Sequence, residues 1–288
     1  MRGPRVPHLL ALSDASMAGT RWVGLTARDR NGGVRTFVLR GTRPSDRPRP
    51  LGRGDMAAWA PRGDVVVLAH QGGSRDGCRR VSVDVVHVST EVPERAVTLP
   101  HLCGGIVSLG RDINTTYFTA RSEGSVDTYS VGIDAVHPVL SGYRLLGVSP
   151  AADFLATPAG GRSTAGAGTS LFWLGTGGPI PYGTAHRPLR VDRVLAWSRD
   201  GSQAAVLGWD GVVHGVFVLD ASAGSDERRL ARFVGVVPGR STFATFASDG
   251  TLYLSLDGVL VRYADGVTRQ VALPAGVPQP MGPILWLP

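Results

Sequence analysis

A strand–turn–strand unit recurs along the chain and constrains the fold more than any other feature. Its clearest copy spans residues 197–201, with the sequence Trp-Ser-Arg-Asp-Gly followed by an apolar run. An Asp side chain such as Asp200 can bond to its own backbone, and Gly201 can take a positive φ, so the segment predicts a tight hairpin turn. Similar copies surround Trp59 and Phe246, each followed by another apolar run.

The repeat fills the chain at a nearly constant period. The residue that follows the aromatic position is, in successive units, Ser13, Ala60, Leu109, Ser149, Ser198 and Ala247. The units are therefore roughly 40–50 residues long, and a second hairpin behind each turn gives four short strands per unit. A β-sandwich, the alternative all-β architecture, has no reason to repeat one turn at this spacing. We therefore predict an all-β, six-bladed β-propeller with four-stranded antiparallel blades.

The repeat also predicts the domain organisation. We expect one propeller domain over residues 1–288, without a second domain or a long linker, and a monomer. The predicted blades are 8–53, 54–101, 102–142, 143–190, 191–239 and 240–274, followed by a ring-closing segment over 275–288. Within that last segment, Pro283 to Leu287 has the composition of a strand that could dock on the first blade.

The turn motif resembles the propeller repeat of TolB-like proteins and, more distantly, WD-repeats. The matching residues are Trp197, Ser198, Asp200 and Gly201; Trp59, Pro61 and Gly63; and Phe246, Ser248, Asp249 and Gly250. The resemblance implies a non-enzymatic scaffold that docks a protein or peptide. The amino-terminal α/β domain of TolB has no counterpart here, so its specific role is not implied. Six-bladed propellers also include lyases, hydrolases and condensing enzymes, which keeps a small-molecule enzyme or binder as the alternative.

Charge at first invites a nucleic-acid interpretation, because the formal net charge is +7. All 30 basic residues are arginine, however, and they are scattered along the chain, as codon bias in a high-GC bacterial genome would produce. We therefore expect no nucleic-acid partner. Without lysine, Schiff-base chemistry and a Gly-Lys-Ser/Thr phosphate loop are excluded.

The apolar segments bear on localisation. No stretch approaches the roughly 20 apolar residues of a membrane helix, so we expect no membrane span. The first thirty residues contain no apolar core of a signal peptide, which predicts a cytoplasmic protein as the sequence is written. An exported or cell-envelope protein whose signal has been removed is the alternative.

Loops at one end of the blades are where we expect a binding face, because a rigid scaffold commonly presents function on its loops. The predicted face contains Asp55, Arg121, Arg144, Arg193, Trp209, Asp210 and Arg240. Trp209 is its strongest member, since a Trp within a four-residue turn has little core to fill. The alternative is that these are ordinary solvated loop residues. We assign Trp59, Trp197 and Phe246 to packing between blades.

The enzyme alternative would use the mouth of a central channel. Its acid–base candidates are His101, Tyr143 and Asp192, expected in loops between blades. No metal and no cofactor are predicted, because the two cysteines and the dispersed histidines lack ligand spacing.

The two cysteines leave two alternatives open. Cys78 is predicted in a hairpin loop of the second blade and Cys103 at the start of the third, on the same face. They could lie close enough for a disulfide, which would indicate an oxidising compartment. Two separate thiols are the other alternative.

Overall fold

The structure is a computed structural model of the 288-residue chain. It describes residues 9–18, 22–29, 33–40, 47–60, 63–75, 78–112, 114–122, 125–132, 135–151, 153–159, 168–172, 180–184, 187–221, 229–236, 242–256 and 258–273. All regular secondary structure in these ranges is β-strand. The chain divides into two compact units, Arg2–Leu145 and Leu146–Pro288, and each is described by itself below. The assignment of one domain to residues 1–288 stays a prediction.

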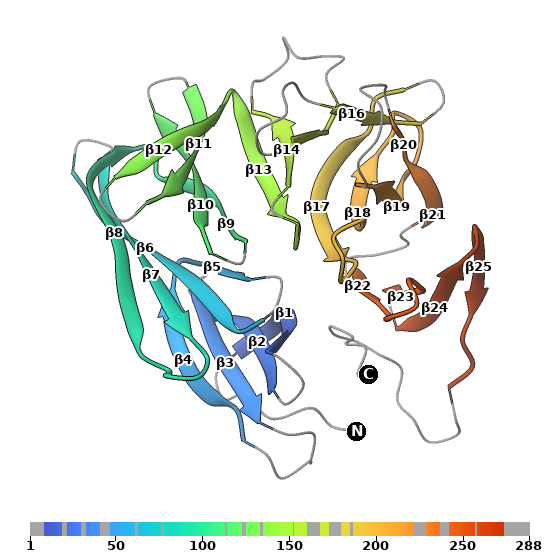
Figure 1. The fold of residues 1–288 in the computed structure, drawn as a ribbon, viewed down its shortest axis with the longest axis horizontal. Helices are drawn as coiled ribbons and strands as arrows, with labels where there is room; N and C mark the ends of the chain where they lie inside the picture. The colour runs from blue at the N-terminus through green and yellow to red at the C-terminus, as the bar shows by residue number, and fades with distance from the viewer. Residues whose placement is uncertain are drawn as a thin grey trace. The chain divides into compact units, whose positions relative to one another are not determined.

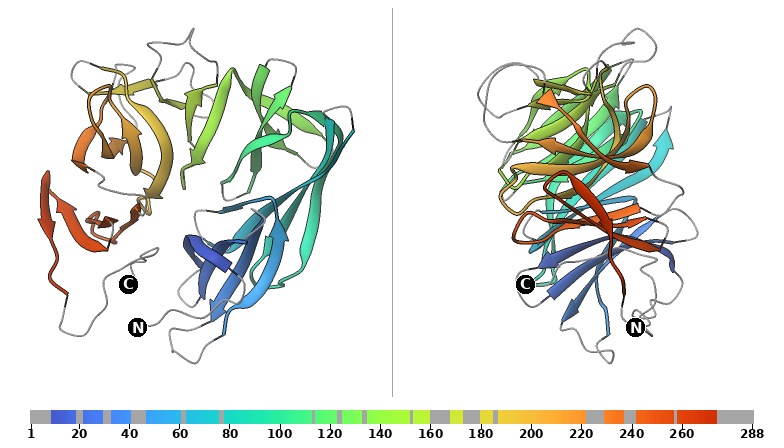
Figure 2. Two further views of the ribbon diagram at one scale, coloured as in Figure 1. Left: turned by 180° about the vertical axis from the view of Figure 1, so that it is seen from behind. Right: turned by 90° about the vertical axis from the view of Figure 1, so that its right-hand side faces the viewer.

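Three antiparallel sheets, blades 1 to 3, follow one another in the first unit, each a meander of four strands in chain order (Figure 1). Blade 1 contains β1 (Leu9–Ala18), β2 (Trp22–Asp29), β3 (Val34–Arg40) and β4 (Arg49–Gly54). Blade 2 contains β5 (Met56–Trp59), β6 (Val65–Arg75), β7 (Cys78–His87) and β8 (Pro93–Cys103). Blade 3 contains β9 (Ile106–Arg111), β10 (Thr116–Ser122), β11 (Ser125–Val131) and β12 (Val136–Ser141). The long strands β6, β7 and β8 of blade 2 are seen from two further sides in Figure 2.

Three more sheets, blades 4 to 6, complete the described chain. Blade 4 contains β13 (Tyr143–Val148), which crosses the unit boundary, β14 (Phe154–Pro158), β15 (Ser170–Phe172) and β16 (Ile180–Gly183). Blade 5 contains β17 (Arg190–Trp197), β18 (Gln203–Trp209), β19 (His214–Asp220) and β21 (Arg232–Val236). Blade 6 contains β22 (Thr242–Phe246), β23 (Leu252–Leu256), β24 (Val259–Ala264) and β25 (Val267–Gln270).

The fold class is therefore all-β, a six-bladed β-propeller of four-stranded antiparallel blades, as the repeat predicts. One departure occurs in blade 4. The short strand β20 (Arg229–Leu230), which comes from the connection between β19 and β21, pairs with β16 in parallel and adds a fifth strand. The ring-closing segment expected over 275–288 lies outside the described residues.

Burial on both faces of a blade explains the continuous apolar run of β6. Val65, Val67 and Ala69 belong to a buried cluster shared with blade 3, whereas Val66 and Leu68 belong to another shared with blade 1. Successive side chains of a strand point to opposite faces. When both faces are covered, all of these side chains are buried, so apolar and polar residues do not alternate. Equivalent clusters join blades 4 and 5, and blades 5 and 6.

The recurring turn has the geometry that its residues predict. The Ser198 hydroxyl donates to Asp200 Oδ1 (2.7 Å) and accepts from the backbone N–H of Gln203 (2.8 Å). The Ser198 hydrogen bond, followed by those from Ser202, lowers the pKa of the Asp200 carboxyl below its usual value. Gly201 has φ +77°, the left-handed conformation that an L side chain rarely adopts.

The aromatic residues of the motif pack between neighbouring blades, as expected. Trp59 Nε1 donates to the Thr26 hydroxyl of blade 1 at 2.8 Å. Trp197 packs on the cluster between blades 4 and 5, and Phe246 on the cluster between blades 5 and 6. The regular spacing of these aromatic residues along the chain therefore follows from the packing of each blade on the next.

Candidate functional site

One end of blade 5 carries a row of exposed side chains on three adjacent strands. Arg190 of β17 is the register partner of Trp209 of β18, which in turn is the partner of His214 of β19. Directly opposed residues on an antiparallel sheet share a face, so the three form one continuous row. All three are exposed, and Trp209 exposes 42% of its surface. The Trp209 side chain is thus exposed between an arginine, Arg190, and a histidine, His214.

Asp192 completes this row from the neighbouring strand position. The register of β17 and β18 shifts between Val191 and Arg193, so Asp192 is the extra residue of a β-bulge. Its Oδ2 lies 2.7 Å from His214 Nε2, and both side chains are about half exposed. A solvent-accessible imidazole held against a carboxylate can bind a polar group or transfer a proton.

The hairpin after Trp209 is held by local hydrogen bonds. Asp210 Oδ1 accepts from the backbone N–H groups of Val212 (2.9 Å) and Val213 (2.8 Å). The hydrogen bond from Val213, with the weaker effect of that from Val212, lowers the pKa of the Asp210 carboxyl. Arg187 Nη1 donates to the carbonyl oxygen of Gly211 at 3.0 Å. Val212, at 69% exposure, is therefore presented beside Trp209 on an ordered turn. We call Arg190, Asp192, Trp209, Val212 and His214 the blade 5 rim.

The structure brings together some of the residues predicted for a binding face. Trp209, Asp210 and Arg193 all lie in blade 5, although Arg193 is engaged through Nη2 with the carbonyl oxygen of Thr242 (3.0 Å). Asp55 follows β4, and its Oδ2 accepts from the backbone N–H of Gln71 at 2.5 Å. Arg240 lies outside the described residues.

Several residues predicted in loops lie within strands. His101 is in β8, Tyr143 and Arg144 open β13, and Arg121 is in β10. Asp192 and Arg193 are likewise in β17, and Trp209 ends β18. The predicted loop positions were wrong because the strands remain paired up to the blade ends.

The convergence of the three acid–base candidates stays a prediction. The side chain of His101 lies outside what the structure describes, and Tyr143 and Asp192 belong to different compact units. Asp192 instead pairs with His214, which is not among the residues predicted for the site. The available signal in the sequence was the place of His214 directly after the short turn that follows Trp209.

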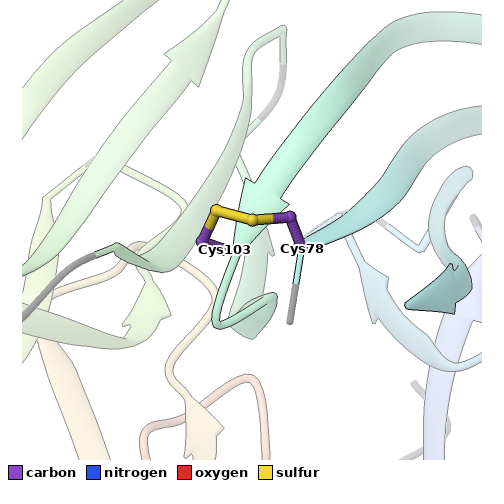
Figure 3. Close-up of a disulfide and its surroundings, with 2 residues drawn as sticks. All are labelled: Cys78 and Cys103. Carbon is purple, nitrogen blue, oxygen red and sulfur yellow. A yellow bond between two sulfur atoms is a disulfide. The ribbon is translucent and has the colours of Figure 1, made fainter. Parts of the chain in front are cut away.

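Blade 2 contains a disulfide between Cys78 and Cys103 (Figure 3). Cys78 opens β7 and Cys103 ends β8, and the two are register partners with Cα atoms 3.9 Å apart. Of the two alternatives the structure has the disulfide, and it lies within one blade; the predicted placement of Cys78 in a hairpin loop and of Cys103 at the start of the third blade was wrong. Strand pairing, which the sequence spacing does not reveal, places the two residues opposite each other.

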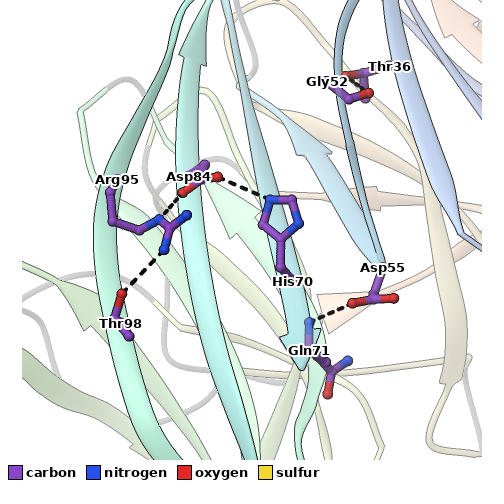
Figure 4. A network of polar contacts seen from close by, with 8 residues as sticks. All are labelled: Thr36, Gly52, Asp55, His70, Gln71, Asp84, Arg95 and Thr98. Carbon is purple, nitrogen blue, oxygen red and sulfur yellow. Dashed lines mark hydrogen bonds and ion pairs between the residues drawn. The ribbon is translucent and has the colours of Figure 1, made fainter. Parts of the chain in front are cut away.

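A polar network lies on the outer strands of the same blade (Figure 4). The buried carboxylate of Asp84 accepts from Arg95 Nε, and its Oδ2 lies 3.1 Å from His70 Nε2. Arg95 Nη1 also contacts the Thr98 hydroxyl at 3.5 Å. A buried carboxylate needs such partners to offset its desolvation, so the network has a structural role in joining β6, β7 and β8.

The described ranges contain no group of three or more His, Cys, Asp or Glu side chains placed to hold a metal ion. They also contain no helix with the length and hydropathy needed to cross a membrane.

Comparisons with known proteins support the fold. No protein-family model matches the chain, and no curated protein matches its sequence. Among solved structures, the β-propeller domain of the Trilobed protease from Pyrococcus furiosus has a TM-score of 0.54 and 10% identity, over 92% of this chain and 86% of that one. Oligogalacturonate lyase from Vibrio parahaemolyticus has a TM-score of 0.57 and 10% identity, over 91% and 78%.

A prolyl endopeptidase structure also matches, with a TM-score of 0.54 and 12% identity over 93% of this chain. This chain spans only 43% of that protein. At these identities the similarity shows a shared propeller fold and nothing about activity.

Proposed function

We propose that this protein is a non-enzymatic propeller scaffold that binds a protein or peptide through the blade 5 rim, acting as a monomer. The observation that carries the proposal is the row formed by Arg190, Trp209 and His214. Exposed Trp and Arg side chains are enriched at the energetic centres of protein interfaces. Because Asp210 and Arg187 already order the hairpin, a partner would meet a preorganised surface and lose less entropy on binding.

The similarity of the turn motif to TolB-like and WD-repeat propellers is consistent with this function. Those propellers act largely as docking surfaces, and we extend that role to this chain as part of the proposal. The Ser198 and Asp200 hydrogen bonds support the motif comparison at the level of the turn.

We further propose that the protein works in an oxidising compartment, as an exported or cell-envelope protein. The support is the Cys78–Cys103 bridge, because disulfides persist outside the reducing cytoplasm. A thiol count on protein isolated from its own host under alkylating conditions tests this. We expect both cysteines to be blocked. Two free thiols would contradict the proposed oxidising compartment and favour the cytoplasm.

Quantitative affinity purification from the native host tests the scaffold. Wild-type protein, a Trp209→Ala variant and a Val267→Ala control would be compared, since Val267 is another exposed large apolar side chain, in blade 6. We expect at least one polypeptide to be retained by wild type and control but lost with Trp209→Ala. Retention of every polypeptide by Trp209→Ala would refute the rim as the binding surface.

A small-molecule enzyme or binder is the second candidate, and the Asp192–His214 pair is the observation in its favour. The shared fold with a lyase and a peptidase is compatible with such chemistry. Native mass spectrometry separates the two candidates. A small-molecule adduct that disappears in His214→Ala would favour this candidate over the scaffold.

A further inference from the structure

Next to the disulfide, two glycines form the corner at which the chain turns from β8 into β9. Cys103 is followed by Gly104 and Gly105, with φ +91° and +73°, and the chain then enters β9. A Cβ on Gly104 would lie 2.6 Å from the carbonyl oxygen of Arg121, so a larger residue would not fit. Arg121 and Gln71 thus fill the space that side chains at Gly104 and Gly105 would need, and Gly105 itself is buried.

Two arginines flank this corner. Arg121 Cβ and Cγ are 3.0 Å from the position of a Cβ on Gly104, and Arg79 Cδ is 4.0 Å from the equivalent position on Gly105. Both arginines are exposed, and neither forms an ion pair with any residue that the structure describes. Two exposed positive charges, on β7 and β10, thus flank the Gly104–Gly105 corner.

The corner is held in place by contacts on both sides. Gln71 Oε1 accepts from the backbone N–H of Ile106 (3.2 Å), and its Nε2 donates to the carbonyl oxygen of the same residue (3.4 Å). The Arg121 N–H donates to the Gly105 carbonyl at 3.0 Å. The disulfide joins the residue before Arg79 to the residue before Gly104. These contacts fix the backbone that carries both arginines.

We propose that Arg79 and Arg121 form a second binding site, which takes an acidic segment of a protein partner. Guanidinium groups bind carboxylates through charge-assisted and often bidentate hydrogen bonds, and the net charge of +7 would attract such a segment. Single-stranded nucleic acid is a poorer fit, because its binding normally uses aromatic stacking platforms. Within Arg2–Leu145, the exposed large apolar side chain among the described residues is Val92, which follows the end of β7, whereas Arg79 lies near the start of that strand.

This site is independent of the blade 5 rim. It lies within Arg2–Leu145, whereas the rim lies within Leu146–Pro288, and they share no residue. A Trp209→Ala variant is therefore expected to bind an acidic peptide as wild type does, and the two proposals can fail separately.

Fluorescence anisotropy of a labelled hexaglutamate peptide at low ionic strength tests the proposal. We expect Arg79→Ala and Arg121→Ala each to weaken binding about fivefold, the effect of losing one exposed ion pair. Arg269→Ala is the matched control, because Arg269 is an exposed arginine of β25 in the other unit. Equal weakening by the control would indicate general charge attraction and overturn the site.

Two further measurements complete the test. A Cys78→Ser/Cys103→Ser double variant is expected to weaken peptide binding while keeping the wild-type far-UV spectrum, because the bridge joins the residue next to Arg79 to the residue next to Gly104. Wild-type affinity in this variant would show that the bridge does not position the two arginines and would remove that part of the proposal. A single-stranded oligonucleotide that binds more tightly than hexaglutamate, with the same dependence on Arg79 and Arg121, would overturn the assignment to an acidic protein segment.

Discussion

The packing of Trp59 against Gly24 yields a prediction that can be worked through in detail. Three carbons of the indole ring lie 2.5–2.7 Å from the position that a Cβ on Gly24 would occupy. Real Cβ contacts are essentially never this short, and the hydrogen bond from Trp59 Nε1 to Thr26 opposes movement of the ring. We expect Gly24→Ala to lower the free energy of unfolding by about 1–3 kcal/mol, the usual effect of overpacking.

A Trp59→Phe substitution should remove most of that penalty. By itself it loses one hydrogen bond, about 1 kcal/mol, and the outer ring carbons, about 2 kcal/mol. Those same carbons create the collision with an alanine at position 24, so the two substitutions are not additive. The double variant is expected to lose about 1–3 kcal/mol less than the sum of the single variants.

Urea unfolding followed by far-UV circular dichroism measures all four corners of this cycle. Gly73→Ala is the control, because nothing lies within 4 Å of a Cβ at that position. It should have the same small effect in wild type and in Trp59→Phe. If Gly24→Ala costs as much in Trp59→Phe as in wild type, the ring does not pack on Gly24 and the reasoning fails.

Three further predictions concern the second compact unit, Leu146–Pro288. The pKa of Asp200 is lowered by its turn hydrogen bonds, so its contribution to stability is present above its usual value of 3.8 and is lost as the pH falls through the lowered value. Asp200→Asn should therefore lose less stability than wild type between pH 5 and pH 2 in thermal melts, and an identical loss would contradict the turn's role. Tyr182→Phe should cost about 1 kcal/mol in urea unfolding, because the fully buried Tyr182 hydroxyl donates to the Asp220 carbonyl at 2.5 Å. Leu155→Ala, at a fully buried position in the cluster between blades 4 and 5, should cost about 2–5 kcal/mol, and a cost below that of Tyr182→Phe would argue against that core.

Local chemistry made the blades predictable from the sequence. The turn at Ser198, Asp200 and Gly201 is closed by hydrogen bonds between residues at most five positions apart, so nearby residues suffice to specify it. The apolar runs that follow such turns become strands covered on both faces, as in β6. Repetition of this unit was enough to predict the number of blades.

The tertiary structure decided where functional side chains meet. Arg190, Trp209 and His214 form one row only because of the strand register, and the bulge at Asp192 brings its carboxylate to His214. The register of β7 and β8 likewise opposes Cys78 and Cys103.

The fifth strand of blade 4 shows the same limit. Pairing of β20 with β16 depends on a segment that leaves its own blade, and no local pattern in residues 229–230 specifies it. Register, bulges and added strands depend on contacts between residues far apart in the chain, whose energies are summed over whole blades. The sequence by itself therefore determined the repeating hairpins and the class of fold, while packing between strands and blades decided the disulfide and the candidate binding surfaces.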